Sequence, residues 1–285
     1  MGQEIARHYF TENDFKEFHV RLKNETRLLD EMLRDKGFSG DHGVGGFELE
    51  AWIIDDNCMP LAINEEFMAH VGDPLLESEL ACFNIEINTH PYRLEGNVLS
   101  KFHRELEKIW SSCLLSARDF DAKLILTGIL PTVTNSDLKP ENMSKRKRYR
   151  ALNDQIMLQR QGNPICIDIK AKDHLKLNHF DVMLEAATTA FQLQFQVDIA
   201  HSVRFINAAM ILSAPVVAVT ANSPFLFGLD LWDETRIPLF EQSVTLRTEE
   251  LDSVDMSKRR VTFGSGYVKD SVVECFTENR ERYEV

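Results

Sequence analysis

The sequence has few of the features that mark secreted or membrane proteins. Its five cysteines are odd in number and scattered, with no CxxC pair. This pattern argues against a cysteine zinc site and indicates a reducing compartment. The N-terminus lacks the apolar core of a signal peptide, and no apolar run approaches the ~20 residues that span a bilayer. We therefore expect a cytoplasmic protein that binds no membrane.

Positive charge is also scarce. The 285 residues carry a net charge of −13, so we expect no nucleic-acid partner, because phosphate contacts need a basic surface. The P-loop, the GxGxxG fingerprint and the HExxH motif are absent from the sequence. The length suits one large or two ordinary domains and is sufficient to bury a sizeable core.

The stretch from Gly46 to Asp55 predicts a strand with two acids on one face. Glu48 and Glu50 are separated by one residue in an otherwise apolar and aromatic run, which places them about 7 Å apart on the same side. Such a pair needs basic partners, a shared proton or hard cations such as Mg2+ to neutralise it. An edge strand with a solvated acidic face is the alternative.

A second acidic strand is predicted from Leu80 to Thr89. Glu86 lies among its apolar residues and shares a face with Asn84 and Asn88. Glu86 is therefore a second candidate metal ligand, and Glu79, just before the strand, is a weaker third. A structural acid with a paired partner is the alternative reading of Glu86.

The chain has one basic cluster, from Lys145 to Arg150. In so acidic a chain this cluster could hold the phosphates of a nucleotide, and Tyr149 and Arg150 are the members that we single out. The alternative is a solvated helix face, which is the usual role of a run of charges.

Glutamines alternate with apolar residues from Thr188 to Asp198, which predicts a half-buried strand. Gln192, Gln194 and Gln196 share one of its faces. Their amides could donate to a ligand or offer a carbonyl oxygen to a cation. A polar, solvent-facing sheet surface is the alternative.

Helical patterns cover much of the remaining chain. Helices are expected from Thr11, a capping residue, to about Lys36, from Asn97 to Arg118, and from Ser202 to Thr220. A short helix with a proline near its start follows Arg236. The guanidinium of Arg236 could bind a substrate carboxylate with two hydrogen bonds.

Taken together, several stretches resemble the glutamate–cysteine ligase type 2 (carboxylate–amine ligase) family. They cover most of residues 40 to 270. In the family's order they are Gly46-Phe47-Glu48-Leu49-Glu50, Glu79, Asn84 to Pro91, Gly128 to Pro131, Arg148-Tyr149, the glutamine strand, and Asn222 to Phe225 with Gly228.

The resemblance implies an α+β fold, a glutamine-synthetase-like curved antiparallel sheet packed against helices. It also implies a ligase that uses ATP and Mg2+ to activate a carboxylate as an acyl phosphate, which an amine then attacks. The expected substrates are small amino acids, with glutamate as donor, a γ-glutamyl amide as product and cysteine as the family's usual acceptor. The implied roles are metal ligands for Glu48, Glu50 and Glu86, cofactor contacts for Arg148, Arg150, Gln192 and Gln194, and catalytic contacts for Arg236 and Tyr149.

Two departures from the family bear on these expectations. Many relatives carry histidine where this chain has Gln192 and Gln194. The family's catalytic domain also continues further, so residues 1–285 are expected to form a single catalytic-type domain without its C-terminal part. Such a domain would turn over slowly, and an unfilled sheet edge would favour a homo-oligomer.

Two other functions stay open on the sequence. One is a non-catalytic remnant that binds nucleotide or a partner protein, favoured by both departures. The other is an enzyme with a guanidino or amine substrate, whose cation the acids would bind.

Overall fold

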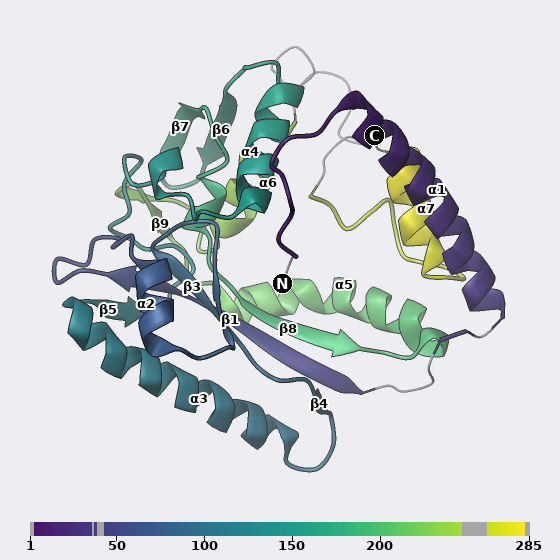
Figure 1. The fold of residues 1–285 in the computed structure, drawn as a ribbon, viewed down its shortest axis with the longest axis horizontal. Coiled ribbons are helices and arrows are strands. Elements are labelled where there is room, and N and C mark those ends of the chain that lie inside the picture. The colour runs from purple at the N-terminus through teal and green to yellow at the C-terminus, as the bar shows by residue number, and fades with distance from the viewer. Residues whose placement is uncertain (1–2, 36, 39–42, 247–260, 283–285) are drawn as a thin grey trace.

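An antiparallel sheet lies at the centre of the structure, a computed structural model that describes residues 3–35, 37–38, 43–246 and 261–282 (Figure 1). Helices and antiparallel sheets together give the expected α+β class. Within the described residues the central sheet contains β1 (Val44–Ile54), β2 (Leu76–Ser78), β3 (Asn84–Asn88), β4 (Tyr92–Arg93), β5 (Lys123–Ile125) and β8 (Phe191–Gln196).

The long strand β1 organises this sheet. It pairs with β3 and β4 along one edge and with β8 and β5 along the other. The register places Glu50 opposite Glu86 of β3, and Glu48 between Asn88 on one side and Gln192 on the other. Because paired residues share a face, these polar side chains form one continuous polar surface.

The opposite face of the sheet is apolar. Ala51, Ile53, Ile85 and Ile87 are fully buried there, in the same core as side chains of α2 (Asn64–Val71) and α3 (Val98–Ala117). Figure 1 shows α3 running along this face. The alternation that points the acids to one side therefore also points the branched aliphatic residues to the helices.

A second core surrounds the stacked rings of Trp52 and Phe83, whose centroids lie 5.2 Å apart. The elements around it and beyond it come largely from the second half of the chain. They are α4 (Lys147–Gln159), β6 (Ile165–Lys170), β7 (His174–His179), α5 (Ser202–Thr220), β9 (Phe225–Leu226), β10 (Leu229–Asp230) and α6 (Arg236–Ser243). The first and last helices, α1 (Glu12–Arg34) and α7 (Val273–Arg282), lie together, and short 3-10 turns occur at Arg118–Phe120, Pro140–Asn142, Glu185–Ala187 and Ile199–His201.

Most predicted elements are present, with shifted ends. Thr11 caps α1 through a reciprocal capping box with Asp14, as its sequence indicates. The second acidic strand begins at Asn84 instead of Leu80, because the backbone N–H of Asn84 closes a turn onto the carbonyl of Ala81. The helix α2 lies between Pro60 and Pro74, in a stretch for which the sequence predicted no helix.

Two expectations from the sequence were wrong, one about the burial of β8 and one about the longest apolar segment. All six residues of β8 are exposed, not half-buried. The described strands pair with β8 only along its β1 edge, so half of its surroundings remain open. The apolar segment Ile199–Thr220 is also long and apolar enough to cross a membrane, contrary to the estimate from the sequence. Length and composition alone do not make it a membrane span, because core helices of soluble proteins share both.

A buried asparagine fixes the loop that leads into β3. The Asn64 amide nitrogen donates to the carbonyls of Ala81 and Asn84, at 3.2 and 3.1 Å, and lies 3.0 Å from the Ser144 hydroxyl. Ser144 in turn donates to the carbonyl of Glu79. This network holds the backbone of the segment between β2 and β3 and therefore sets the position of Glu79.

We expect Asn64→Ala to lower the free energy of unfolding by about 2 kcal/mol, because several hydrogen bonds of a side chain that is 1% exposed are lost. Urea denaturation followed by circular dichroism measures the change. Asn24→Ala on the exposed side of α1 is the matched control and should stay within about 0.5 kcal/mol of the unaltered chain. Equal stability of the two variants would contradict the role given to Asn64.

Candidate functional site

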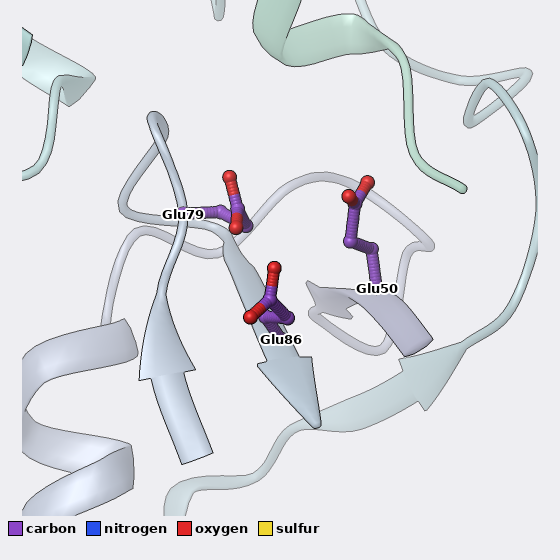
Figure 2. A group of neighbouring side chains, drawn as sticks. All are labelled: Glu50, Glu79 and Glu86. Carbon is purple, nitrogen blue, oxygen red and sulfur yellow. The ribbon is translucent and has the colours of Figure 1, made fainter. Parts of the chain in front are cut away.

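Three carboxylates converge on the polar face of the sheet. Glu50 comes from β1, Glu86 from the facing position of β3, and Glu79 from the segment between β2 and β3. Each offers one oxygen, and these oxygens all lie within 4.8 Å of one another. Figure 2 shows the three side chains on the same side of the strands. We call Glu50, Glu79 and Glu86 the acidic triad.

The acidic triad holds protons unusually tightly. Burial, the charges of Glu50 and Glu86, and a hydrogen bond to the Glu86 carboxyl together raise the pKa of Glu79 to about 9. Burial also raises the pKa of Glu50 to about 7, although hydrogen bonds from Ala190 and Gln192 oppose the shift. At neutral pH the triad on its own therefore retains a proton between like charges.

This donor set fits a hard divalent cation. All three groups are carboxylates, the ligand type that Mg2+ prefers, and they come close enough together to share one ion. A cation would replace the retained proton and offset both the burial of charge and the repulsion that raise the two pKa values. Glu50, Glu79 and Glu86 are thus the residues that would hold it.

Glu48, which the sequence grouped with Glu50 and Glu86, lies outside the acidic triad. Its side chain is only 4% exposed, and its carboxylate accepts a hydrogen bond from the Gln194 amide. Burial and the charge of Glu86 raise its pKa. The structure therefore places Glu79 where the sequence expected Glu48, while the metal role of Glu48 stays a prediction.

The glutamines of β8 contact the acids directly. The Gln192 amide donates to Oε1 of Glu50, at 2.8 Å, and the backbone N–H of Ala190 donates to Oε2 of Glu50, also at 2.8 Å. Gln192 and Gln194 thus orient Glu50 and Glu48, one glutamine to each acid. Their contact with a cofactor stays a prediction.

Within the basic cluster, Arg148 and Tyr149 contact the segment that leads to Glu79, and Arg150 does not. The Arg148 guanidinium lies 4.8 Å from the ring centroid of Tyr149 and donates to its hydroxyl at 3.0 Å. The Tyr149 hydroxyl donates to the carbonyl of Ser78, the residue before Glu79. Arg150 is exposed and pairs with Asp154 one helical turn away, at 3.8 Å.

Tyr149 is placed as a hydrogen-bond donor. Burial and the charge of Glu79 raise its pKa to about 12, against the opposing effect of Arg148. The phenol therefore stays protonated at neutral pH and does not act as a base. Arg148 supplies positive charge beside the acids, since Glu77 and Glu79 contribute to raising its own pKa against burial.

Arg236 is engaged within the protein. Its guanidinium forms two hydrogen bonds with Glu234, and Nη1 donates to the carbonyl of Thr189 at 2.5 Å. A Cβ on Gly128 would come within 2.8 Å of Arg236 Nε, so this packing requires glycine there. Because Thr189 precedes Ala190, Arg236 anchors the backbone that donates to Glu50. Binding of a substrate anion by Arg236 stays a prediction.

Sequence reasoning missed Glu185, an additional acid near the triad. It lies in the short turn Glu185–Ala187. Burial and the charge of Glu50 raise its pKa to about 7. A three-residue turn has no periodicity from which its orientation could be predicted. The one available signal is a single acid in an otherwise apolar stretch.

A cavity of about 400 Å³ adjoins the acids at the other end of the polar face. Glu48, Asn88 and Gln194 line it, and Gly45 and Gly46 form part of its wall without side chains to fill it. The cavity offers carboxylate and amide groups beside the acidic triad, so it is suited to a small polar ligand with an amino group.

The geometry predicts that Glu79, a member of the acidic triad, contributes more to cation binding than Glu48 does. We expect Glu79→Gln to weaken Mg2+ binding about 10-fold or more, because the variant removes a converging charge. Glu48→Gln, on the same face but outside the triad, is the matched control and should have the smaller effect. Isothermal calorimetry measures both affinities. A larger loss for Glu48→Gln would favour the set predicted from the sequence.

Stability should depend on pH in a defined direction. The folded-state pKa values of Glu50 and Glu79, about 7 and about 9, exceed the ordinary value of 4.5. As pH rises from 4.5 to 9, the unfolded chain therefore releases these protons before the folded chain does, and the free energy of unfolding falls. Mg2+ should oppose this fall, because the cation binds the charged form.

Thermal unfolding measured at a series of pH values tests this expectation. Glu79→Gln should flatten the decline between pH 7 and 9, since a neutral amide has no proton to lose. Glu66→Gln, at an exposed position of α2, should leave the slope unchanged. An unaltered slope in the Glu79→Gln protein would rule out the triad as its source.

Comparison with known proteins places the chain in a family. A search among curated proteins found no match. The model of the family described as glutamate-cysteine ligase family 2 (GCS2) matches residues 45–269, which include the acidic triad, the glutamines of β8 and Arg236. This match covers most of the chain, and the chain therefore belongs to glutamate-cysteine ligase family 2.

Proposed function

We propose that this protein is an ATP- and Mg2+-dependent ligase that joins the γ-carboxylate of glutamate to an amine. The observation that carries the proposal is the convergence of Glu50, Glu79 and Glu86 in a member of a carboxylate–amine ligase family. We further propose that the curved antiparallel sheet is of the glutamine-synthetase-like type, with its polar face as the catalytic face.

In this proposal Glu50, Glu79 and Glu86 hold Mg2+. When bound, the cation neutralises the phosphate charge that develops during phosphoryl transfer. The chain's own contribution is to position the three carboxylates. Gln192 and the Ala190 N–H orient Glu50, and the Asn64 network places the segment that carries Glu79.

The remaining groups would bind the substrates. Arg148 is a positively charged side chain beside the triad, and its guanidinium is suited to bind a phosphate oxygen. The hydroxyl of Tyr149 stays protonated, so it can donate a hydrogen bond but cannot act as a base. The cavity beside Glu48 would take the amino acid, with Asn88 and Gln194 as hydrogen-bonding partners for its ammonium and carboxylate groups.

The proposed reaction has two steps. The γ-carboxylate oxygen of glutamate attacks the terminal phosphorus of ATP, forming an acyl phosphate and releasing ADP. The amine nitrogen then attacks the acyl carbon, the C–O bond to phosphate breaks, and the amine loses a proton. The products are the γ-glutamyl amide, ADP and inorganic phosphate.

The free cysteines bear on the cellular compartment in which this reaction would take place. The five cysteines are all free, as in a reducing compartment. We therefore propose that the enzyme acts in the cytoplasm, where ATP and free amino acids are also present.

Release of ADP with Mg2+, ATP, glutamate and a panel of amines tests the function. We expect ADP formation to require Mg2+ and to rise with one or more amines, cysteine included. Glu86→Gln should lower the rate about 100-fold or more, as loss of a group that stabilises charge in a transition state typically does. Glu66→Gln, remote on α2, should keep the rate.

Calorimetry with a non-hydrolysable ATP analogue distinguishes the alternative. Mg2+-dependent binding of the analogue without amine-dependent ADP release would overturn the ligase proposal and favour a non-catalytic nucleotide-binding protein. If the analogue does not bind and no ADP is released, the function does not involve ATP.

A further inference from the structure

The first described residues of the chain lie against the start of α4. Residues 3–8, which we call the N-terminal strap, run from α1 past α4 (Figure 1). Oε1 of Glu4 accepts a hydrogen bond from the backbone N–H of Arg148, at 3.3 Å. The Lys147 ammonium donates to the carbonyl of Ala6, at 2.8 Å. The strap is thus joined to the first turn of α4.

Glu4 supplies the negative charge that the start of a helix favours. The first N–H groups of a helix have no partner within it, and the helix dipole makes that end positive. Arg146, the N-cap residue of α4, makes no side-chain cap hydrogen bond. Burial favours the neutral acid, but hydrogen bonds from the N–H of Ile5 and from the first N–H groups of α4, together with the charge of Arg146, lower the pKa of Glu4. A charged carboxylate therefore takes the place of the missing cap.

The same end of α4 is unusually basic. Positions 145 to 148 are all lysine or arginine, and the first turn of α4 contains no acid. Helices normally have acids there, because cations oppose the positive end of the dipole. Sequences that break such a local rule do so most often at functional sites. The basic side chains and the helix start together suit an anion with more charge than a carboxylate, such as a phosphate.

This anion position adjoins the acidic triad. Nε of Arg146 donates to the hydroxyl of Ser78, at 3.0 Å. Ser78 directly precedes Glu79, so the start of α4 is fixed to the segment that carries one member of the triad. A phosphate attracted both to a cation at the triad and to the basic start of α4 would therefore compete with Glu4. The identity of this phosphate as that of ATP rests on the proposed function.

The N-terminal strap is held by contacts at the surface. None of its residues is buried, and only Ile5 and His8 are half-buried. An ion pair between Arg7 and Asp14 joins the strap to α1, and both side chains are partly exposed. Segments with little buried apolar surface and exposed hydrogen bonds open at a small cost in free energy. A competing anion can therefore release the strap while the rest of the protein stays folded.

We propose that the N-terminal strap is an internal inhibitor, in which the Glu4 carboxylate occupies the start of α4 and must be displaced before a phosphate binds there. The closed strap weakens phosphate binding, and by reciprocity bound phosphate opens the strap. Closure about nine-tenths of the time lowers the apparent affinity for phosphate about 10-fold. The inhibition is competitive, so it raises the ATP concentration that the reaction needs without changing the rate at saturation.

Calorimetry with pyrophosphate, in EDTA so that no cation occupies the triad, tests the inference without the ligase reaction. We expect Glu4→Ala to bind pyrophosphate about 10-fold more tightly than the unaltered chain, because the competing carboxylate is gone. Glu12→Ala removes the same charge from an exposed position at the start of α1 and should leave the affinity unchanged. Equal affinities in all three proteins, an equal gain in both variants, or no binding by any of them would overturn the proposal.

Limited digestion with trypsin reports on the strap itself. Cleavage after Arg7, identified by mass spectrometry, should become faster when pyrophosphate is added to the unaltered chain. In Glu4→Ala the same cleavage should be fast without pyrophosphate. Sodium chloride at equal ionic strength is the control for screening of the strap's ion pairs. A cleavage rate that pyrophosphate and sodium chloride change equally, or that neither changes, would contradict displacement of the strap.

ADP release separates this inference from the proposed function. Glu4→Ala should lower the KM for ATP about 10-fold and leave kcat unchanged, as loss of a competitive inhibitor requires. Tighter pyrophosphate binding by Glu4→Ala with no ADP release from any form would support the strap and contradict the ligase. ADP release with the same KM in Glu4→Ala and the unaltered chain would support the ligase and overturn the strap.

Discussion

The pairing of β1 with β3 is the constraint on which the rest of the site depends. With Glu50 opposite Glu86 in an antiparallel register, two carboxylates face each other across adjacent strands, an arrangement that is unfavourable for like charges. A shift of one residue in either strand would turn the acid of that strand into the apolar core against α2 and α3. The aliphatic face of the same strands prevents that shift, so the core that stabilises the sheet also forces the acids together.

The surrounding residues hold the acids in place without neutralising them. Gln192 and the Ala190 N–H hold Glu50, and the Asn64 network fixes the backbone at Glu79. These are neutral donors, so a proton or a cation must still balance the charge. The guanidinium of Arg148 lies beside the acids, and its positive charge can attract an anion to the triad. The geometry is therefore that of a site prepared for a charged ligand.

The ion pair of Arg236 and Glu234 connects the backbone beside the acidic triad with the end of α5. On one side it holds the carbonyl of Thr189, immediately before the Ala190 N–H that contacts Glu50. On the other side Glu234 accepts the hydroxyl of Ser223, which follows α5. The apolar helix and the acidic triad are thus both held by a single buried cluster.

The sequence by itself determined the strands with their acids on one face, the three long helices and the family, because alternation, helical spacing and an ordered set of motifs are local properties of the chain. It did not determine that Glu79 joins Glu50 and Glu86, that Glu185 approaches them, or that Arg236 donates to the carbonyl of Thr189. Those contacts join segments far apart in the chain, through loops and short turns without periodicity. The exposure of β8 and α5 was also decided only in three dimensions, since an apolar pattern indicates that a surface should be covered but not what covers it.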